Sequence, residues 1–174
     1  MIDNDYVFEI SEILDTEKLL TIALNAKNDV TLKKHQFDIN QDPYLQDIQK
    51  KFPILGRTWN FYSFLPYQGI DPHIDARRTC ALNIPLKGSE NSLTTFYHPE
   101  DNMEKEYSDR GVLYYIKKPL EIAYQFTLTK PALIKTSVPH SVRAGFSPRS
   151  IISWGIHELD FSQSKKFFQS MSVL

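Results

Sequence analysis

The sequence predicts a mainly β domain, a sandwich or barrel of about eight strands that helices precede. Three observations carry this prediction. Short runs rich in aromatic and β-branched residues follow one another between residues 57 and 157, separated by glycine and proline turn signals. Two earlier stretches have apolar residues at helical spacing. The 174 residues, 41% of them hydrophobic and 24% charged, suit one soluble globular domain.

We expect a single domain over residues 1–174, made of a helical flank over 1–56, a β core over 57–157 and a C-terminal tail over 158–174. The flank is interpreted as a short strand followed by two helices. The strand lies within 6–13. The first helix starts after the candidate N-cap Asp15, and the second runs from Pro43 to Phe52 before Pro53 ends it. The polar stretch between the two helices carries no predicted element.

The core begins with a strand from Trp59 to Leu65 that carries aromatic side chains on both faces, so both faces are expected to be covered. Pro66, Gly69 and Pro72 predict a loop after it. The polar window 98–111 is interpreted as a surface excursion, and the tail from Phe161 as a helix on the sheet. Further strands are predicted over 79–86, 93–97, 112–116, 122–128, 132–135, 140–143 and 150–156.

Composition limits the classes of partner and the compartment. The 20 basic and 21 acidic residues leave a formal net charge of −1, which gives no overall attraction to nucleic acid or to a membrane surface. Cys80 is the only cysteine, so no disulfide can form within the chain. There is no signal-peptide pattern and no apolar run near the ~20 residues that a membrane helix needs. We therefore expect a cytoplasmic protein, with no membrane and no nucleic acid among its partners.

One set of residues has the spacing of a metal site. His73 and Asp75 are two apart, so on a strand they point to the same side. His140 follows Pro139 where a later strand should begin, and it is the best candidate for a third ligand. Two histidines and one carboxylate form the facial triad that holds Fe(II) and leaves three positions open. A His-x-Asp pair alone is a weak pattern, so its surroundings decide.

An arginine strengthens this hypothesis. Arg149 follows His140 by nine positions, and residues 145–148 between them read as a turn. We therefore expect His140 and Arg149 on adjacent antiparallel strands, with the guanidinium beside the metal pocket. Arginine is well suited to bind a carboxylate through two hydrogen bonds.

Together, the segments Asp71-Pro72-His73-Ile74-Asp75 and Ser137-Val138-Pro139-His140-Ser141-Val142, with Arg149 after them, resemble the Fe(II)/2-oxoglutarate-dependent dioxygenase superfamily. The likeness is to its aspartyl/asparaginyl hydroxylase and prolyl-hydroxylase-like branches, which include compact phage-type members, and it covers residues 57–157. It implies a double-stranded β-helix, or jelly-roll, with flanking N-terminal helices. It also implies an enzyme that uses O₂ to hydroxylate an unactivated C–H bond of an amino-acid or peptidyl substrate.

The resemblance assigns roles residue by residue. His73, Asp75 and His140 would bind Fe(II), and Arg149 would bind the C5 carboxylate of 2-oxoglutarate. Because Asp75 retains the carboxylate that related halogenases replace, hydroxylation is expected. Many relatives carry asparagine three residues after the second histidine. Here that residue is Arg143, a second candidate for the carboxylate anchor, although the spacing of Arg149 fits better.

Relatives often have a hydroxyl two residues after the arginine. Here that residue is Ile151, and the hydroxyls of Ser150 and Ser153 lie nearby instead. Tyr62 is interpreted as a co-substrate ligand or a core aromatic residue. Asn83, in an otherwise apolar strand, lines the pocket or has a structural role.

The remaining charged residues are less informative. Arg77 and Arg78 follow the triad carboxylate and are interpreted as solvated loop charges, with substrate binding as the alternative. The segment 98–118 is a candidate lid or substrate loop.

Two other functions stay open at this point. One is a cupin-like metalloenzyme that does not use 2-oxoglutarate, which the lack of a His-x-His pair disfavours. The other is a non-catalytic jelly-roll module. The expected ligand is a small-molecule or peptide substrate, and the sequence leaves the oligomeric state open.

Overall fold

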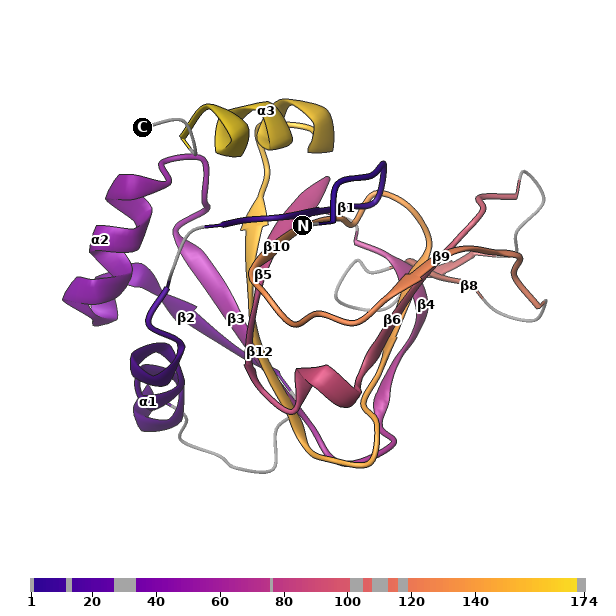
Figure 1. Ribbon diagram of the computed structural model, residues 1–174, viewed down its shortest axis with the longest axis horizontal. Coiled ribbons are helices and arrows are strands. Elements are labelled where there is room, and N and C mark those ends of the chain that lie inside the picture. The colour runs from indigo at the N-terminus through magenta and orange to yellow at the C-terminus, as the bar shows by residue number, and fades with distance from the viewer. Residues whose placement is uncertain are drawn as a thin grey trace.

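Two antiparallel sheets face one another in the computed structural model (Figure 1). It describes residues 2–11, 14–26, 34–75, 77–100, 105–107, 113–115 and 119–171. Within these residues each sheet has six strands. We call them sheet I and sheet II.

Sheet I forms the wall that carries the helices. It contains, in order across the sheet, β1 (Val7–Glu9), β10 (Ala132–Lys135), β5 (Cys80–Lys87), β12 (Arg149–Ile156), β3 (Thr58–Phe64) and β2 (Lys34–Asp38). Sheet II forms the opposite wall. It contains β7 (Lys105–Tyr107), β8 (Leu113–Tyr115), β4 (Gly69–Ile74), β11 (His140–Arg143), β6 (Leu93–Tyr97) and β9 (Ile122–Phe126).

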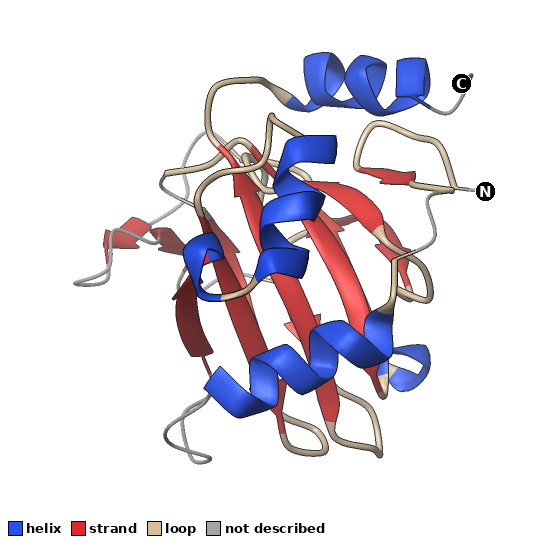
Figure 2. Ribbon diagram, turned by 90° about the vertical axis from the view of Figure 1, so that its left-hand side faces the viewer, coloured by secondary structure: helices blue, strands red, loops and turns tan. Residues whose placement is uncertain are grey.

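Helices cover the outer side of sheet I, as Figure 2 shows. They are α1 (Thr16–Ala26), α2 (Pro43–Lys51) and α3 (Phe161–Met171), with short 3₁₀ turns at Ile39–Gln41 and Ser89–Asn91. The start of α2 follows from its sequence: the Asp42 side chain accepts a hydrogen bond from the Tyr44 amide, and Pro43 occupies the first turn. No helix in the described part of the chain is long and apolar enough to cross a membrane.

The alternation of side chains along the central strands builds two cores. On β12, Ile152 and Trp154 pack toward the helices, whereas Ile151 packs between the sheets. On β3, Trp59 and Phe61 join the helix-side core. The smaller core between the sheets consists of Val7, Phe96, Phe126, Leu128, Ala132, Ile134 and Ile151. Both faces of sheet I are thus covered, as the aromatic pattern of β3 predicts.

The predicted fold class is confirmed: the protein is mainly β and forms a jelly-roll with N-terminal helices. The predicted C-terminal helix is also present as α3. Of the candidate loop 98–118, residues 101–104, 108–112 and 116–118 lie outside the described residues.

Three local predictions were wrong. The polar stretch before α2 contains β2, an edge strand that pairs with β3 and buries Phe37. The predicted loop at 66–72 is partly β4, because Pro72 lies where the register against β11 shifts, and a missing N–H costs little there.

The third concerns His140 and Arg149, which lie on facing sheets rather than on adjacent strands. β11 pairs with β4 and β6 in sheet II, and β12 pairs with β3 and β5 in sheet I. The connection at 144–148 crosses between the sheets. A hydrogen bond from the Tyr67 amide to Gly145 O, at 2.9 Å, holds this connection.

Candidate metal centre

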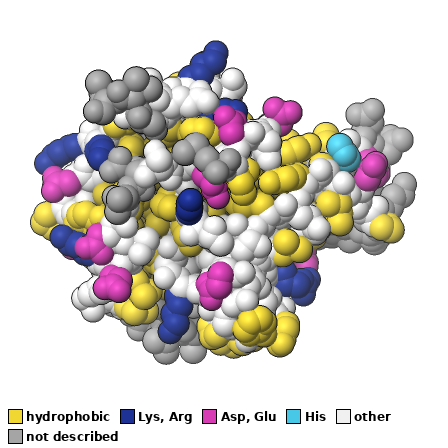
Figure 3. All heavy atoms as spheres, viewed as in Figure 1, with side chains coloured by type: hydrophobic (Ala, Val, Ile, Leu, Met, Phe, Trp, Pro, Cys, Tyr) yellow, Lys and Arg dark blue, Asp and Glu magenta, His cyan; other side chains and the backbone are white. Residues whose placement is uncertain are grey.

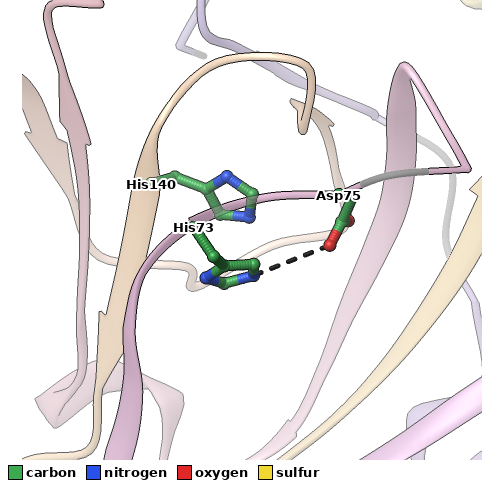
Figure 4. Close-up of side chains that lie close together, drawn as sticks. All are labelled: His73, Asp75 and His140. Atoms are coloured by element: carbon green, nitrogen blue, oxygen red, sulfur yellow. Dashed lines mark ion pairs between the residues drawn. The ribbon is translucent and has the colours of Figure 1, made fainter. Parts of the chain in front are cut away.

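Sheet pairing brings the two candidate histidines together. His73 on β4 and His140 on β11 are directly opposed in the antiparallel ladder. Their ring centroids are 4.3 Å apart, and each residue is only 5% exposed. Figure 4 shows the two rings side by side, between their strands and the Asp75 carboxylate.

Asp75 lies just beyond the end of β4, where its amide donates to Thr136 O at 3.1 Å. Its Oδ1 is 3.6 Å from His73 Nε2. One ligand atom from each of His73, Asp75 and His140 lies within 4.8 Å of the other two. The three side chains can therefore hold one metal ion between them.

Backbone carbonyls fix which imidazole nitrogen faces the site. His73 Nδ1 donates to Asp71 O at 2.8 Å, and His140 Nδ1 donates to Val138 O at 2.9 Å. In a neutral imidazole this leaves Nε2 without a proton, as a metal ligand must be. Carbonyl groups commonly orient metal-binding histidines in this way.

Burial sets the charge of the three groups. It lowers the pKa of His140 to about 4, with the neighbouring His73 adding to the effect. Burial also lowers the pKa of His73, and the opposing pull of Asp75 does not outweigh it. Burial alone would raise the pKa of Asp75, but Arg78 and the two histidines lower it overall. At neutral pH the site thus offers two neutral imidazoles and a carboxylate, a donor set that suits Fe(II) and related divalent ions.

Arg78 is part of this site, so the interpretation as a solvated loop charge was wrong for it. Its Nε donates to Asp75 Oδ2 at 2.5 Å. Its Nη1 donates to Ser153 Oγ, on β12 of sheet I, at 2.9 Å. The Arg78 side chain is 15% exposed, whereas Arg77 beside it is exposed. The three-residue spacing from Asp75 was the only signal in the sequence.

A cavity lies between the sheets next to the histidines, and its empty space, counted together with the part open to solvent, is about 440 Å³. Sheet I contributes three of the predicted residues to its wall, Tyr62, Asn83 and Ser153. Asn83 Oδ1 is buried, and none of the described residues hydrogen-bonds to it. The other lining residues are Phe64, Ile70, His73, Arg78, Thr94, Ile134, Thr136, His140, Val142 and Ile151.

Arg149 is completely buried, with an exposed fraction of 0%. It lies two and four positions before Ile151 and Ser153 on β12, so its side chain is on the same face of the strand as these two cavity-lining residues. It pairs with Phe64 on β3. Its Nε and Nη1 have no hydrogen-bond partner among the described residues. Burial lowers the pKa of Arg149 to about 10, so it still carries its charge at neutral pH.

The alternative anchor, Arg143, lies elsewhere. Its side chain is 68% exposed, and it contacts Tyr67 O and Asp71 at the surface. Burying a charged guanidinium whose Nε and Nη1 lack partners in the described part of the chain is costly, and the exposed Arg143 carries no such cost.

The other histidines stay outside the site. His157 Nδ1 donates to Arg77 O, and the ring of His35 stacks on Phe37. Charge on the surface is mixed. On the face seen in Figure 3, basic and acidic side chains are interspersed.

Comparisons with known proteins establish the fold. No protein-family model matches the sequence, and no curated protein matches it. Among solved structures, ycfD from E. coli matches with a TM-score of 0.56 and 13% identity, covering 96% of this chain and 53% of that one. A prolyl-4-hydroxylase from Pseudomonas putida matches with a TM-score of 0.51 and 13% identity, covering 89% and 95%.

An oxidoreductase of the 2OG-Fe(II) oxygenase family from Burkholderia pseudomallei matches with a TM-score of 0.48 and 12% identity, covering 86% of this chain and 81% of that one. The chain spans about half the length of ycfD. The protein therefore shares its fold with ycfD and with this prolyl-4-hydroxylase.

Proposed function

We propose that this chain is an Fe(II)- and 2-oxoglutarate-dependent dioxygenase that hydroxylates an unactivated C–H bond of an amino-acid or peptidyl substrate. The observation that carries the proposal is the pairing of two features in one fold. A His-Asp-His group that can hold a metal ion borders the cavity, and a buried arginine, whose Nε and Nη1 have no hydrogen-bond partner in the described part of the chain, lies on the cavity-facing side of β12.

Each side chain has a distinct task in this proposal. His73, Asp75 and His140 hold the iron. Bound Fe(II) would supply the oxidising chemistry, in which 2-oxoglutarate and O₂ yield succinate and CO₂ while a C–H bond becomes C–OH. Arg149 binds the C5 carboxylate of 2-oxoglutarate, because that carboxylate supplies the charge and the acceptors that its Nε and Nη1 lack.

The cavity wall from sheet I completes the proposed co-substrate site. Tyr62 and Asn83 border the space between the histidines and β12, where a bound dicarboxylate would lie. Ser153 acts less directly, since its hydroxyl accepts a hydrogen bond from Arg78. The apolar residues Phe64, Ile134 and Ile151 exclude water from the same space.

Arg149 also separates this proposal from its alternatives. A cupin-like metalloenzyme that does not use 2-oxoglutarate needs the three metal ligands but gives Arg149 no anion. A non-catalytic jelly-roll module explains neither the metal ligands nor the cost of burying a guanidinium whose Nε and Nη1 lack partners among the described residues. The substrate class rests on the resemblance of the motifs to the hydroxylase branches.

The test is calorimetric titration of 2-oxoglutarate into Mn(II)-loaded protein, for wild type, R149M and R143M. Mn(II) takes the place of iron without the oxygen chemistry. Wild type should bind 2-oxoglutarate only with metal present. R149M should bind at least about 30-fold more weakly, because it loses a charge-assisted pair worth roughly 2 kcal/mol. R143M is the matched control and should bind like wild type. Equal affinity in R149M and wild type would remove Arg149 from the co-substrate site.

A further inference from the structure

The two oxygens of the Asp75 carboxylate have different neighbours. Oδ1 faces the histidines and lies 3.6 Å from His73 Nε2. Oδ2 points the other way and accepts a hydrogen bond from Arg78 Nε at 2.5 Å. Both side chains are largely buried, at 11% and 15% exposed. One oxygen is therefore free for a metal ion, and the other is engaged by a guanidinium.

Arg78 is itself held in place from several directions. Its Nη1 donates to Ser153 Oγ on β12 at 2.9 Å, and its side chain also hydrogen-bonds Tyr62 on β3. Its backbone carbonyl accepts a hydrogen bond from Thr136 Oγ1 at 3.0 Å. Arg78 thus ties the carboxylate ligand, which follows sheet II, to the central strands of sheet I. Rotating Asp75 would break this chain of hydrogen bonds.

A carboxylate can bind a metal ion through one oxygen or through both. In a six-coordinate site, two histidines and a one-oxygen aspartate leave three positions open. Two-oxygen binding by the aspartate leaves only two, which a chelating co-substrate would fill. The Arg78–Asp75 contact therefore bears on whether a position remains for O₂.

We propose that Arg78 is a positioning residue that restricts Asp75 to one-oxygen metal binding and so keeps the third open position of the centre available. The purpose of that position, to receive O₂, rests on the proposed oxygenase function. The restriction follows because chelation by Asp75 requires the Oδ2 atom, and Oδ2 would have to leave a buried, charge-assisted hydrogen bond. Ser153 supports the restriction by anchoring the far end of the guanidinium.

The test uses probes that need neither 2-oxoglutarate nor turnover. Wild type, R78M, R78K, S153A and R77M are loaded with Co(II), whose visible spectrum reports coordination number. Each is saturated with oxalate, which takes two positions, and then titrated with azide, which takes the third. R77M is the matched control, because Arg77 is the exposed neighbour of Arg78.

R78M should retain Co(II) binding, because losing a nearby positive charge and gaining a second aspartate oxygen both favour the metal. Its azide affinity in the presence of oxalate should fall at least about fivefold, because Asp75 can then bind the ion through both oxygens and compete with azide for the third position. The azide affinities of R78K and S153A should lie between those of R78M and wild type, since each variant keeps part of the Arg78 contacts. R77M should match wild type.

Two results would overturn the proposal. One is an azide affinity in Co(II)-loaded R78M that falls less than about fivefold below that of wild type. The other is loss of Co(II) binding by folded R78M, which would make Arg78 necessary for the ligand itself rather than for its mode of binding. If R78M does not fold, as judged by circular dichroism, R78K takes its place, and a wild-type azide affinity in R78K would overturn the proposal.

This test can fail independently of the proposed function. If wild type binds Co(II), oxalate and azide but never 2-oxoglutarate, the oxygenase proposal falls and the result for Arg78 stands. If 2-oxoglutarate binds through Arg149 and the azide affinity of R78M is unchanged, the function stands and the role of Arg78 falls.

Discussion

His73 and His140 occupy directly opposed positions on β4 and β11, and their ring centroids are 4.3 Å apart. The register of sheet II therefore sets the distance between the two histidines. Strand pairing is a rigid support, so it fixes the spacing of the two imidazoles.

Replacing either histidine should abolish metal binding. H73A or H140A leaves two ligands, and we expect the stoichiometry measured with Co(II) to fall from one ion per chain to below about 0.1 at micromolar protein. H157A is the control, because His157 is exposed and contacts Arg77 O outside the site. Full Co(II) binding by both single variants would mean that the ion is held elsewhere.

The register itself can be disturbed at Gly69. A Cβ on this residue would lie 1.9 Å from the carbonyl oxygen of Val142, too close for any real contact. G69A should therefore push β4 away from β11, lowering the free energy of unfolding by about 2 kcal/mol or more and weakening metal binding. Urea denaturation and Co(II) titration measure the two effects. A stable G69A variant with unaltered metal affinity would show that the strands tolerate separation at this end.

The metal-free protein should lose stability as the pH falls below 6.5. His140 has a pKa of about 4 in the folded protein, against an ordinary value of 6.5. Between these values the unfolded chain takes up a proton that the folded chain does not, so acid favours unfolding. The free energy of unfolding should drop by about 2 kcal/mol from pH 7 to pH 5 on account of His140. Below about pH 4 this loss levels off.

Urea denaturation at several pH values measures this slope. H140N, which cannot titrate, should lose less stability over the same range, with the remainder due to the lowered pKa of His73. The same slope in H140N and wild type would show that His140 titrates normally in the folded protein.

Removing the charge of Arg149 should stabilise the protein. Two nitrogen atoms of the buried guanidinium have no partner within the residues that the structure describes, so R149M should raise the free energy of unfolding by about 1–3 kcal/mol in the absence of 2-oxoglutarate. R143M, at the exposed arginine on the other sheet, should change it by less than about 0.5 kcal/mol. Urea denaturation compares the three proteins. A destabilised R149M would mean that the guanidinium already has a partner in the folded chain.

Local patterns predicted much of the fold. Alternation on β3 indicated that Trp59 and Phe61 face one core and Tyr62 the other side, and Pro43 marked the start of α2. Patterns of this kind depend on neighbouring residues alone. The edge strand β2 escaped prediction because only Phe37 in it is apolar and buried.

Long-range geometry was harder to predict. Spacing alone cannot tell whether β11 and β12 form a hairpin or lie on facing sheets, because the same turn at 144–148 serves both. Spacing favoured Arg149 over Arg143 as the carboxylate anchor, but the burial of Arg149 and the exposure of Arg143 are visible only in the three-dimensional structure. Arg78 was missed because its contact with Asp75 depends on the path of the chain after β4 and on Ser153, far along the sequence.

An anaerobic titration of metal-free protein with Fe(II) and then 2-oxoglutarate, followed by visible absorption, tests the proposed oxygenase function most directly. We expect a weak charge-transfer band that needs both additions, is lost in H73A and is weakened in R149M. R143M should give the wild-type band. Wild-type protein that binds Fe(II) but shows no band with 2-oxoglutarate, or binds no Fe(II) at all, would contradict the oxygenase assignment.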